Sequence, residues 1–194
     1  MRLPLQGSHA IVDDHVGPLK PADLKGPVAP VDNSEQMHLL SVPTTPVVQL
    51  RRLVVETSQP IQLLDITDEV AAFVRATGIT DGIVNVFSRH TTAAVRIQED
   101  EPLLLEDLRD FLQRLTPAGT YYRHNDFRVR THHMHDDESP NGHSHCLQFL
   151  LGTGESVPIV DGELLLGTWQ RIFLVELDGP RSRREVLIQT FGVS

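Results

Sequence analysis

Short apolar segments alternate with glycine-bearing breaks between residues 143 and 190. Strand-length runs rich in β-branched residues and joined by turns are typical of hairpins and meanders. We therefore predict strands over residues 143–151, 155–160, 163–166, 170–177 and 185–190. Because no helical segment separates them, they favour an α+β fold with a mainly antiparallel sheet over a doubly wound α/β fold. The stretch 172–175 is apolar at every position, which predicts a strand covered on both faces.

Two principal helices are predicted upstream, over residues 68–77 and 102–115. Thr67 can cap the first, and Gly78 can end it in a left-handed conformation. Pro102 suits the first turn of the second helix. Its apolar positions share one face: Leu104, Leu108, Phe111, Leu112 and Leu115. Further strands are expected over residues 48–57, 82–88 and 93–98, with the last two joined by a turn over residues 89–92.

Proline divides the chain into two parts. Residues 1–46 contain seven of the thirteen prolines and show no sustained period, so we expect a largely irregular arm there. Residues 47–194 are expected to form a single domain, because 194 residues with 40% apolar content can bury one substantial core. The longest apolar runs fall short of the roughly 20 residues that a membrane-spanning helix needs, so no membrane role is expected.

Charge and cysteine content limit the partners. The formal net charge of −9 argues against nucleic-acid binding, which depends on clustered Lys and Arg. Basic residues nevertheless gather at Arg181, Arg183 and Arg184, so a small anionic ligand is compatible with the sequence. The single cysteine, Cys146, can form no internal disulfide, which fits a reducing compartment, and a cytoplasmic location is expected.

The sequence Asn141-Gly142-His143-Ser144-His145 carries the strongest signal of a site. In an extended strand, residues two apart point to the same side, so His143 and His145 would present two imidazoles together. His124 is our candidate third ligand, and a catalytic metal typically takes about three protein ligands plus water. We therefore predict a divalent metal site, with zinc as one candidate ion. For His132, His133 and His135, which run into acidic residues, a solvated loop is the simpler interpretation.

Three motif blocks extend this interpretation: residues 88–94 (SRHTTAA), 141–145 (NGHSH), and 166–170 (LGTWQ) followed by 178–181 (DGPR). In this order, over about residues 48 to 193, the chain resembles the YjbQ-like family. The resemblance implies a compact α+β fold built as a β-sandwich with helices, and a homotrimer. It also implies a secondary thiamine-phosphate synthase activity. The long proline-rich arm and the histidine-rich loop depart from the family pattern, although neither touches the motif blocks.

Thiamine-phosphate synthesis releases pyrophosphate, so a catalyst needs cations or oriented donors beside the leaving group. Arg181 offers a planar fork of donors, and His90 can transfer a proton near neutral pH. Thr91 and Thr92 bring hydroxyls to the same turn, and Glu99 is a candidate general base. Three further residues complete the expected substrate- or anion-binding set: Asn141, Trp169 and Gln170.

Each of these residues also has a structural interpretation. His90, Thr91 and Thr92 can bond the backbone of their own turn. Trp169 can be a core aromatic residue, and Arg181 can be solvated or paired with Glu99 or Asp178. Glu99, Asp100 and Glu101 can stabilise the amino end of the following helix.

Three functional hypotheses therefore stand side by side. The first is a metal-assisted enzyme acting on a small phosphorylated metabolite. The second is a metal-dependent hydrolase, because three histidines leave a metal position open for water. The third is a trimeric binding or regulatory protein that holds a phosphate-containing ligand without turnover.

Overall fold

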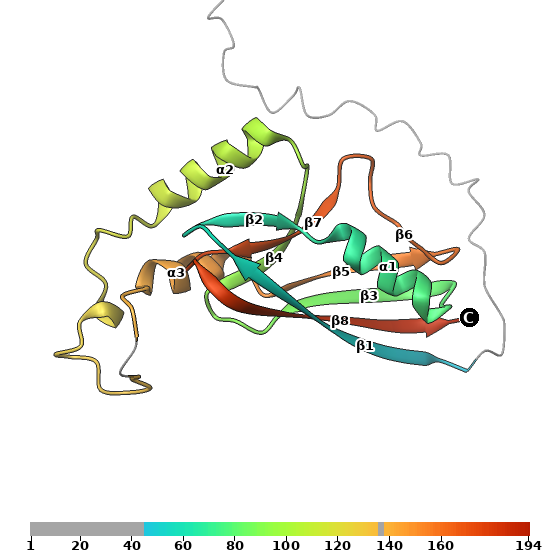
Figure 1. Cartoon of the computed structure of the whole chain (residues 1–194), viewed down its shortest axis with the longest axis horizontal. Helices are drawn as coiled ribbons and strands as arrows, with labels where there is room; N and C mark the ends of the chain where they lie inside the picture. The colour runs from blue at the N-terminus through green and yellow to red at the C-terminus, as the bar shows by residue number, and fades with distance from the viewer. Residues whose placement is uncertain (1–44, 136–137) are drawn as a thin grey trace, which may run out of the picture. The chain divides into compact units, whose positions relative to one another are not determined.

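The structure is a computed structural model that describes residues 45–135 and 138–194 (Figure 1). Two antiparallel sheets pack together, one with strand order β1-β8-β3-β5-β6 and one with order β2-β7-β4. The strands are β1 (Val47–Thr57), β2 (Gln62–Asp65), β3 (Asp81–Ser88), β4 (Ala93–Gln98), β5 (Gly154–Val160), β6 (Glu163–Leu164), β7 (Arg171–Glu176) and β8 (Arg181–Val193). The helices are α1 (Thr67–Thr77), α2 (Pro102–Leu115), the 3-10 turn η2 (Arg123–Asn125) and α3 (Gly142–Leu151). The predicted α+β class is confirmed.

Strand β7 is covered on both faces, as its unbroken apolar run predicts. Ile172 and Leu174 point into the core between the two sheets. Phe173 and Val175 point the other way, into a second cluster that contains Leu112 of α2 and Leu147 of α3. The smaller sheet is therefore a middle layer, with the larger sheet on one side and helices on the other. The arm predicted for residues 1–46 lies, apart from its last two residues, outside the described residues.

Helix α1 begins and ends close to the predicted limits. Its apolar stripe of Val70, Phe73 and Val74 is buried, and Gly78 ends it with a φ of 72°. The predicted cap is wrong, because Thr67 is the first helical residue and the N-cap position makes no side-chain hydrogen bond. Asp65 instead accepts hydrogen bonds from the backbone N–H of Thr67 at 2.9 Å and from its hydroxyl at 2.6 Å.

Helix α2 spans Pro102–Leu115, as predicted. Glu101 caps it by accepting hydrogen bonds from the two backbone N–H groups at 103 and 104. Its apolar face is only partly covered within one chain, since Leu112 is buried whereas Phe111 and Leu115 are exposed.

The strand predicted over residues 143–151 is wrong, because this segment is helix α3. Ser144 and Leu147 are fully buried on its inner side, and the Ser144 hydroxyl donates a hydrogen bond to the Leu177 carbonyl at 2.6 Å. Phe149, which alternation would place beside Leu147, is 85% exposed. A short apolar run fits either period, and here the contact of Ser144 with Leu177, the residue after β7, decides in favour of the helix.

One end of the smaller sheet gathers segments that are distant in the sequence. Ala93 at the start of β4 lies opposite Glu176 at the end of β7. Helix α3 contacts β4 and η2, and the start of β8 follows shortly after β7. Figure 1 shows α3 and the long loop after α2 at the end where β7 finishes and β8 begins. No helix in the described part of the chain is long and apolar enough to cross a membrane.

Candidate functional site

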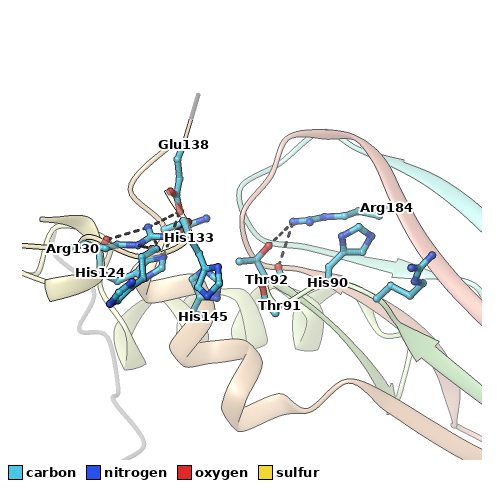
Figure 2. A pocket seen from close by; sticks show the side chains of 12 residues that line it. His90, Thr91, Thr92, His124, Arg130, His133, Glu138, His145 and Arg184 are labelled. Atoms are coloured by element: carbon cyan, nitrogen blue, oxygen red, sulfur yellow. Dashed lines mark hydrogen bonds and ion pairs between the residues drawn. The ribbon is translucent and has the colours of Figure 1, made fainter. Parts of the chain in front are cut away.

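A cavity of about 670 Å³ opens at this end of the smaller sheet (Figure 2). Its walls come from the β3–β4 turn, the loop between η2 and α3, the first turn of α3, and β8. The described residues that line it are rich in imidazole and guanidinium groups: Arg89, His90, Thr91, Thr92, His124, Arg130, His132, His133, Glu138, Asn141, His145 and Arg184. The NGHSH block and the HTT turn therefore meet at one cavity.

A buried ion pair stands behind one wall. The carboxylate of Glu176 is fully buried and pairs with Arg184, which is 5% exposed, with 2.6 Å between Arg184 Nε and Glu176 Oε2. Glu176 also accepts hydrogen bonds from the Thr57 hydroxyl at 2.9 Å and from the backbone N–H groups of residues 177 and 178. Burial alone raises the pKa of Glu176, but these hydrogen bonds, led by that of Arg184, outweigh it and lower the pKa below its usual value.

This ion pair fixes Arg184 against the HTT turn. Arg184 Nη2 lies 3.1 Å from the Thr92 hydroxyl oxygen, which accepts its hydrogen bond. Thr92 is buried, whereas Thr91 is exposed at the cavity. Thr92 therefore holds a cation that lines the cavity, and Thr91 remains accessible to a ligand.

His90 lines the cavity and is anchored by β8. Its Nε2 accepts a hydrogen bond from the backbone N–H of Glu185 at 2.8 Å. Burial of the ring lowers the pKa of His90, and the positive charges of Arg184 and Arg89 lower it further. Glu176 and Glu185 act in the opposite direction without reversing the shift.

His124 and His145 come together, as the sequence predicts. Their ring centroids are 4.6 Å apart, with the edge of one ring toward the other. Burial lowers the pKa of His145, and the neighbouring His124 and Arg130 lower it further, whereas the charge of Asp178 acts in the opposite direction without reversing the shift. Arg130 Nη1 lies 3.2 Å from His124 Nε2 and 2.6 Å from Glu138 Oε1, so this guanidinium joins the loop to the histidine pair (Figure 2).

His143 lies apart from this pair. Residues two apart in a helix are separated by about 200° around the axis, so the side chains at 143 and 145 diverge. The ring of His143 is 6.3 Å from that of Tyr122, and its Nδ1 is buried without a hydrogen-bond partner among the described residues. No three His, Cys, Asp or Glu side chains in the described ranges converge as a metal centre would require.

Two further predicted residues form one polar cluster. Asn141 donates a hydrogen bond from Nδ2 to Asp178 Oδ2 at 3.0 Å, and Arg181 Nη2 lies 2.6 Å from the same oxygen. Asn141 also lines the cavity. Arg181 thus adopts the pairing with Asp178 that its sequence neighbourhood allows, and it is not among the residues that line the cavity.

Glu99, Trp169 and Gln170 lie toward the opposite end of the smaller sheet. At that end Gln98 of β4 pairs with Arg171 of β7, and these two residues adjoin Glu99 and Gln170 in the sequence. The cavity lies at the other end, where position 93 pairs with position 176. Five residue steps along a strand separate these ends by about 17 Å. Trp169 is 70% exposed, and none of the three lines the cavity.

Sequence reasoning missed Glu176, Arg130 and Glu138. Glu176 had a detectable signal, because a carboxylate that directly follows the apolar run 172–175 at the end of a buried strand needs a partner. Arg184 belonged to the basic cluster noted from the sequence. Arg130 and Glu138 lie in an irregular loop, where spacing gives no guide to contacts.

Comparison with known proteins identifies the class to which this fold and cavity belong. The sequence profile described as UPF0047 protein YjbQ-like matches residues 51–193. The chain belongs to this family.

Relatives occur in both archaea and bacteria. A UPF0047 protein of Methanothermobacter thermautotrophicus is 41% identical over 137 residues, covering 71% of this chain and 88% of that protein. The UPF0047 protein YugU of Bacillus subtilis is 34% identical over 134 residues, covering 69% of this chain and 93% of that protein.

Solved structures share the fold. A YbjQ-like protein of unknown function from Sulfolobus solfataricus P2 is 35% identical with a TM-score of 0.69, covering 76% of this chain and 99% of that one. A hypothetical protein from Aeropyrum pernix K1 is 34% identical with a TM-score of 0.65, covering 75% and 99% of the two chains.

Proposed function

We propose that the chain binds a small phosphorylated metabolite in the cavity and acts on it as an enzyme. The observation that carries this proposal is the charge of the walls. Three guanidinium groups, from Arg89, Arg130 and Arg184, line the cavity. Each pairs with a carboxylate, that of Glu185, Glu138 or Glu176, and of these only the Glu138 carboxylate lines the cavity itself. The described lining therefore presents more guanidinium than carboxylate groups, in a chain whose formal net charge is −9. Planar guanidinium groups match phosphate oxygens in geometry and charge.

The groups present suit a reaction in which a phosphate-bearing group leaves. Arg184 is held by Glu176 and Thr92 before any ligand arrives, so it needs little reorganisation to stabilise developing negative charge. His145 lines the same cavity and its pKa is lowered from the usual value of 6.5, so near pH 7 its neutral ring can accept a proton. Together these groups provide charge stabilisation and a base within one cavity.

Thiamine-phosphate synthesis is the specific reaction that we propose to test. It joins a pyrimidine pyrophosphate to a thiazole phosphate and releases pyrophosphate, so it requires room for two anionic groups. The cavity of about 670 Å³ and its three arginines are compatible with that requirement. Hydrolysis of a phosphate ester is the alternative reaction, and binding without turnover is the alternative outside the enzymes.

A divalent metal, with zinc as one candidate, remains a separate proposal. The residues described here fit the predicted three-histidine centre poorly, because His124 and His145 adjoin while His143 faces Tyr122. In addition, the guanidinium of Arg130 lies 3.2 Å from His124 Nε2, where a metal ion would have to bind that nitrogen. A metal at the histidine pair would have fewer than the about three protein ligands of typical catalytic zinc sites. The chemistry above therefore relies on arginine and histidine.

A homotrimer also remains part of the proposal. The outer face of the larger sheet carries a row of apolar side chains, Val48, Phe191 and Ile83, which lie opposite one another on β1, β8 and β3. All three are exposed in a single chain. Contiguous exposed apolar surface is typical of an interface. Light scattering at several concentrations measures the assembly directly.

Calorimetric titration with inorganic pyrophosphate tests the binding step. Arg89→Gln and His145→Asn should each weaken binding about tenfold or more, because each removes a direct ligand contact. Arg75→Gln is the matched control, since Arg75 forms an exposed ion pair with Glu163 outside the cavity. Equal affinity of the cavity variants and the control would contradict the proposed site.

Turnover requires a second assay. Protein expressed in a host strain that lacks its own thiamine-phosphate synthase should convert the two precursors to product, and His145→Asn should abolish the conversion. Pyrophosphate binding without turnover of either precursor or of phosphate esters would favour the binding or regulatory protein. Metal analysis of the same preparation, together with His143→Ala, tests the three-histidine prediction.

A further inference from the structure

The hydrogen bond at His90 defines which nitrogen of its ring carries the proton. A backbone N–H can only donate, so His90 Nε2, which lies 2.8 Å from the Glu185 nitrogen, must accept through its lone pair. A neutral imidazole with an acceptor at Nε2 carries its hydrogen on Nδ1. The contact therefore selects the Nδ1–H tautomer.

The position of His90 in the fold explains why this contact forms. Strand β3 ends at Ser88, whose partner on β8 is Val186. The next carbonyl of β8, that of Glu185, accepts from the Arg89 N–H at 3.3 Å. The N–H of the same residue points to the same side of the strand, where β3 supplies no further carbonyl. His90 Nε2 takes the place of that missing ladder acceptor.

The charged groups around His90 make the neutral ring the stable form. A second proton on Nε2 would face the Glu185 N–H and break the hydrogen bond. Burial, Arg184 of β8 and Arg89 of the turn lower the pKa of His90, whereas Glu176 of β7 and the Glu185 side chain raise it, and the net shift is downward. The ring therefore stays neutral near pH 7, as its usual pKa of 6.5 is already below that pH.

The second ring nitrogen remains available. Nδ1 of His90 makes no hydrogen bond within the described ranges, while the residue lines the cavity beside Thr91 and Arg184. A neutral N–H at such a place can donate to an oxygen of a ligand, but it offers no lone pair there to accept a proton.

We propose that His90 is a hydrogen-bond donor to an oxyanion of the bound ligand, through Nδ1–H, and does not serve as the general base. This assignment rests on the proposed function for the ligand and on the Glu185 contact for the tautomer. It leaves His145, which lines the same cavity, as the proton acceptor of the site.

Two isosteric variants separate the two ring nitrogens. Asn places its amide nitrogen close to the position of histidine Nδ1, so His90→Asn keeps a donor toward the cavity and loses the contact with Glu185. Gln reaches the position of Nε2, so His90→Gln keeps the acceptor for Glu185 and loses the donor. A merely structural role for His90 predicts the opposite order of effects, because only His90→Gln preserves the bond to β8.

Calorimetry with inorganic pyrophosphate is the binding readout. We expect His90→Asn to bind within about threefold of the wild type and His90→Gln to bind about tenfold or more weakly, as for loss of a hydrogen bond to a charged group. Circular dichroism confirms that each variant is folded before titration. Weaker binding by His90→Asn than by His90→Gln would overturn the donor assignment.

Nitrogen NMR of the ¹⁵N-histidine-labelled wild-type protein tests the tautomer without any variant. We expect Nδ1 of His90 to be protonated and Nε2 to be of the unprotonated type above about pH 7, with Nδ1 shifting when pyrophosphate is added. A protonated Nε2 in the free protein would overturn the tautomer. Failure of the wild type to bind pyrophosphate would overturn the proposed function and the ligand contact together, while the free-protein spectrum still judges the tautomer.

Discussion

Replacing Glu176 by Gln should destabilise the protein strongly. The substitution keeps the side-chain volume but removes the charge that faces Arg184, which is 5% exposed. Removing one partner of a buried ion pair leaves the other charge buried without compensation, at a cost of about 3–5 kcal/mol. The Gln side chain would also place amide N–H donors where the Glu176 carboxylate now accepts hydrogen bonds from the Thr57 hydroxyl and from two backbone N–H groups. We therefore expect a loss of about 4 kcal/mol.

Urea unfolding followed by circular dichroism measures the loss. With a slope of about 2 kcal/mol/M, a cost of about 4 kcal/mol moves the midpoint down by about 2 M. The matched control is Glu163→Gln, which removes the same charge from an exposed pair with Arg75 at 3.0 Å. Exposed pairs contribute about 0–1 kcal/mol, so the control should move little. All samples need the same protein concentration, because assembly stabilises the folded state.

A double variant separates the charge from the packing. Glu176→Leu combined with Arg184→Met removes both charges and should recover much of the lost stability, because apolar residues of similar volume often replace a buried ion pair at little cost. A loss in Glu176→Gln that matches the exposed control would refute the reasoning. So would a double variant that is no more stable than Glu176→Gln.

Three further predictions use the same unfolding assay. Gly82→Ala should cost about 1–3 kcal/mol by overpacking, because a Cβ would lie 2.3 Å from a backbone oxygen of β8, whereas Gly119→Ala meets nothing within 4 Å and should be neutral. Leu147→Ala should reduce the free energy of unfolding by about 2–5 kcal/mol, whereas Phe149→Ala, at an 85% exposed position, should change it by no more than about 0.5 kcal/mol. Equal losses in the two variants would favour a strand, which would place both side chains on one face. The pKa of His90 is lowered in the folded state, so below pH 6.5 the unfolded state binds more protons and the free energy of unfolding should decrease as the pH falls through that value. His90→Asn should lack the His90 contribution to this decrease.

The fold could be predicted where one period dominates the sequence. Strand β7 has no polar residue between positions 172 and 175, and its two-sided burial follows directly. Helix α2 has proline at its first position and leucines at helical spacing, so even its limits were correct. Segment 142–151 satisfies both periods, and the hydrogen bond of the buried Ser144 to Leu177, just after β7, is a tertiary contact that no local pattern contains. The wrong prediction of a strand over residues 143–151 therefore has a defined physical cause.

The same error determined how much of the site could be predicted. His90, Thr91, Thr92, His124 and His145 do line one cavity. His143 does not join them, because a helix sends residues two apart to different sides whereas a strand sends them to one side. A motif in the sequence can thus identify the right region of a chain while the secondary structure decides which of its side chains meet.

The buried pair of Glu176 and Arg184 has a geometric role that stability alone does not explain. An apolar pair of similar volume would often stabilise a core equally well. The ion pair, however, holds a guanidinium against Thr92 where it lines the cavity. Glu176 ends the buried strand β7, and Arg184 lies near the start of β8, so the rigid sandwich sets the position of this cation. The double variant should consequently recover stability while losing pyrophosphate affinity, and a double variant that recovers both would show that the cation has no part in binding.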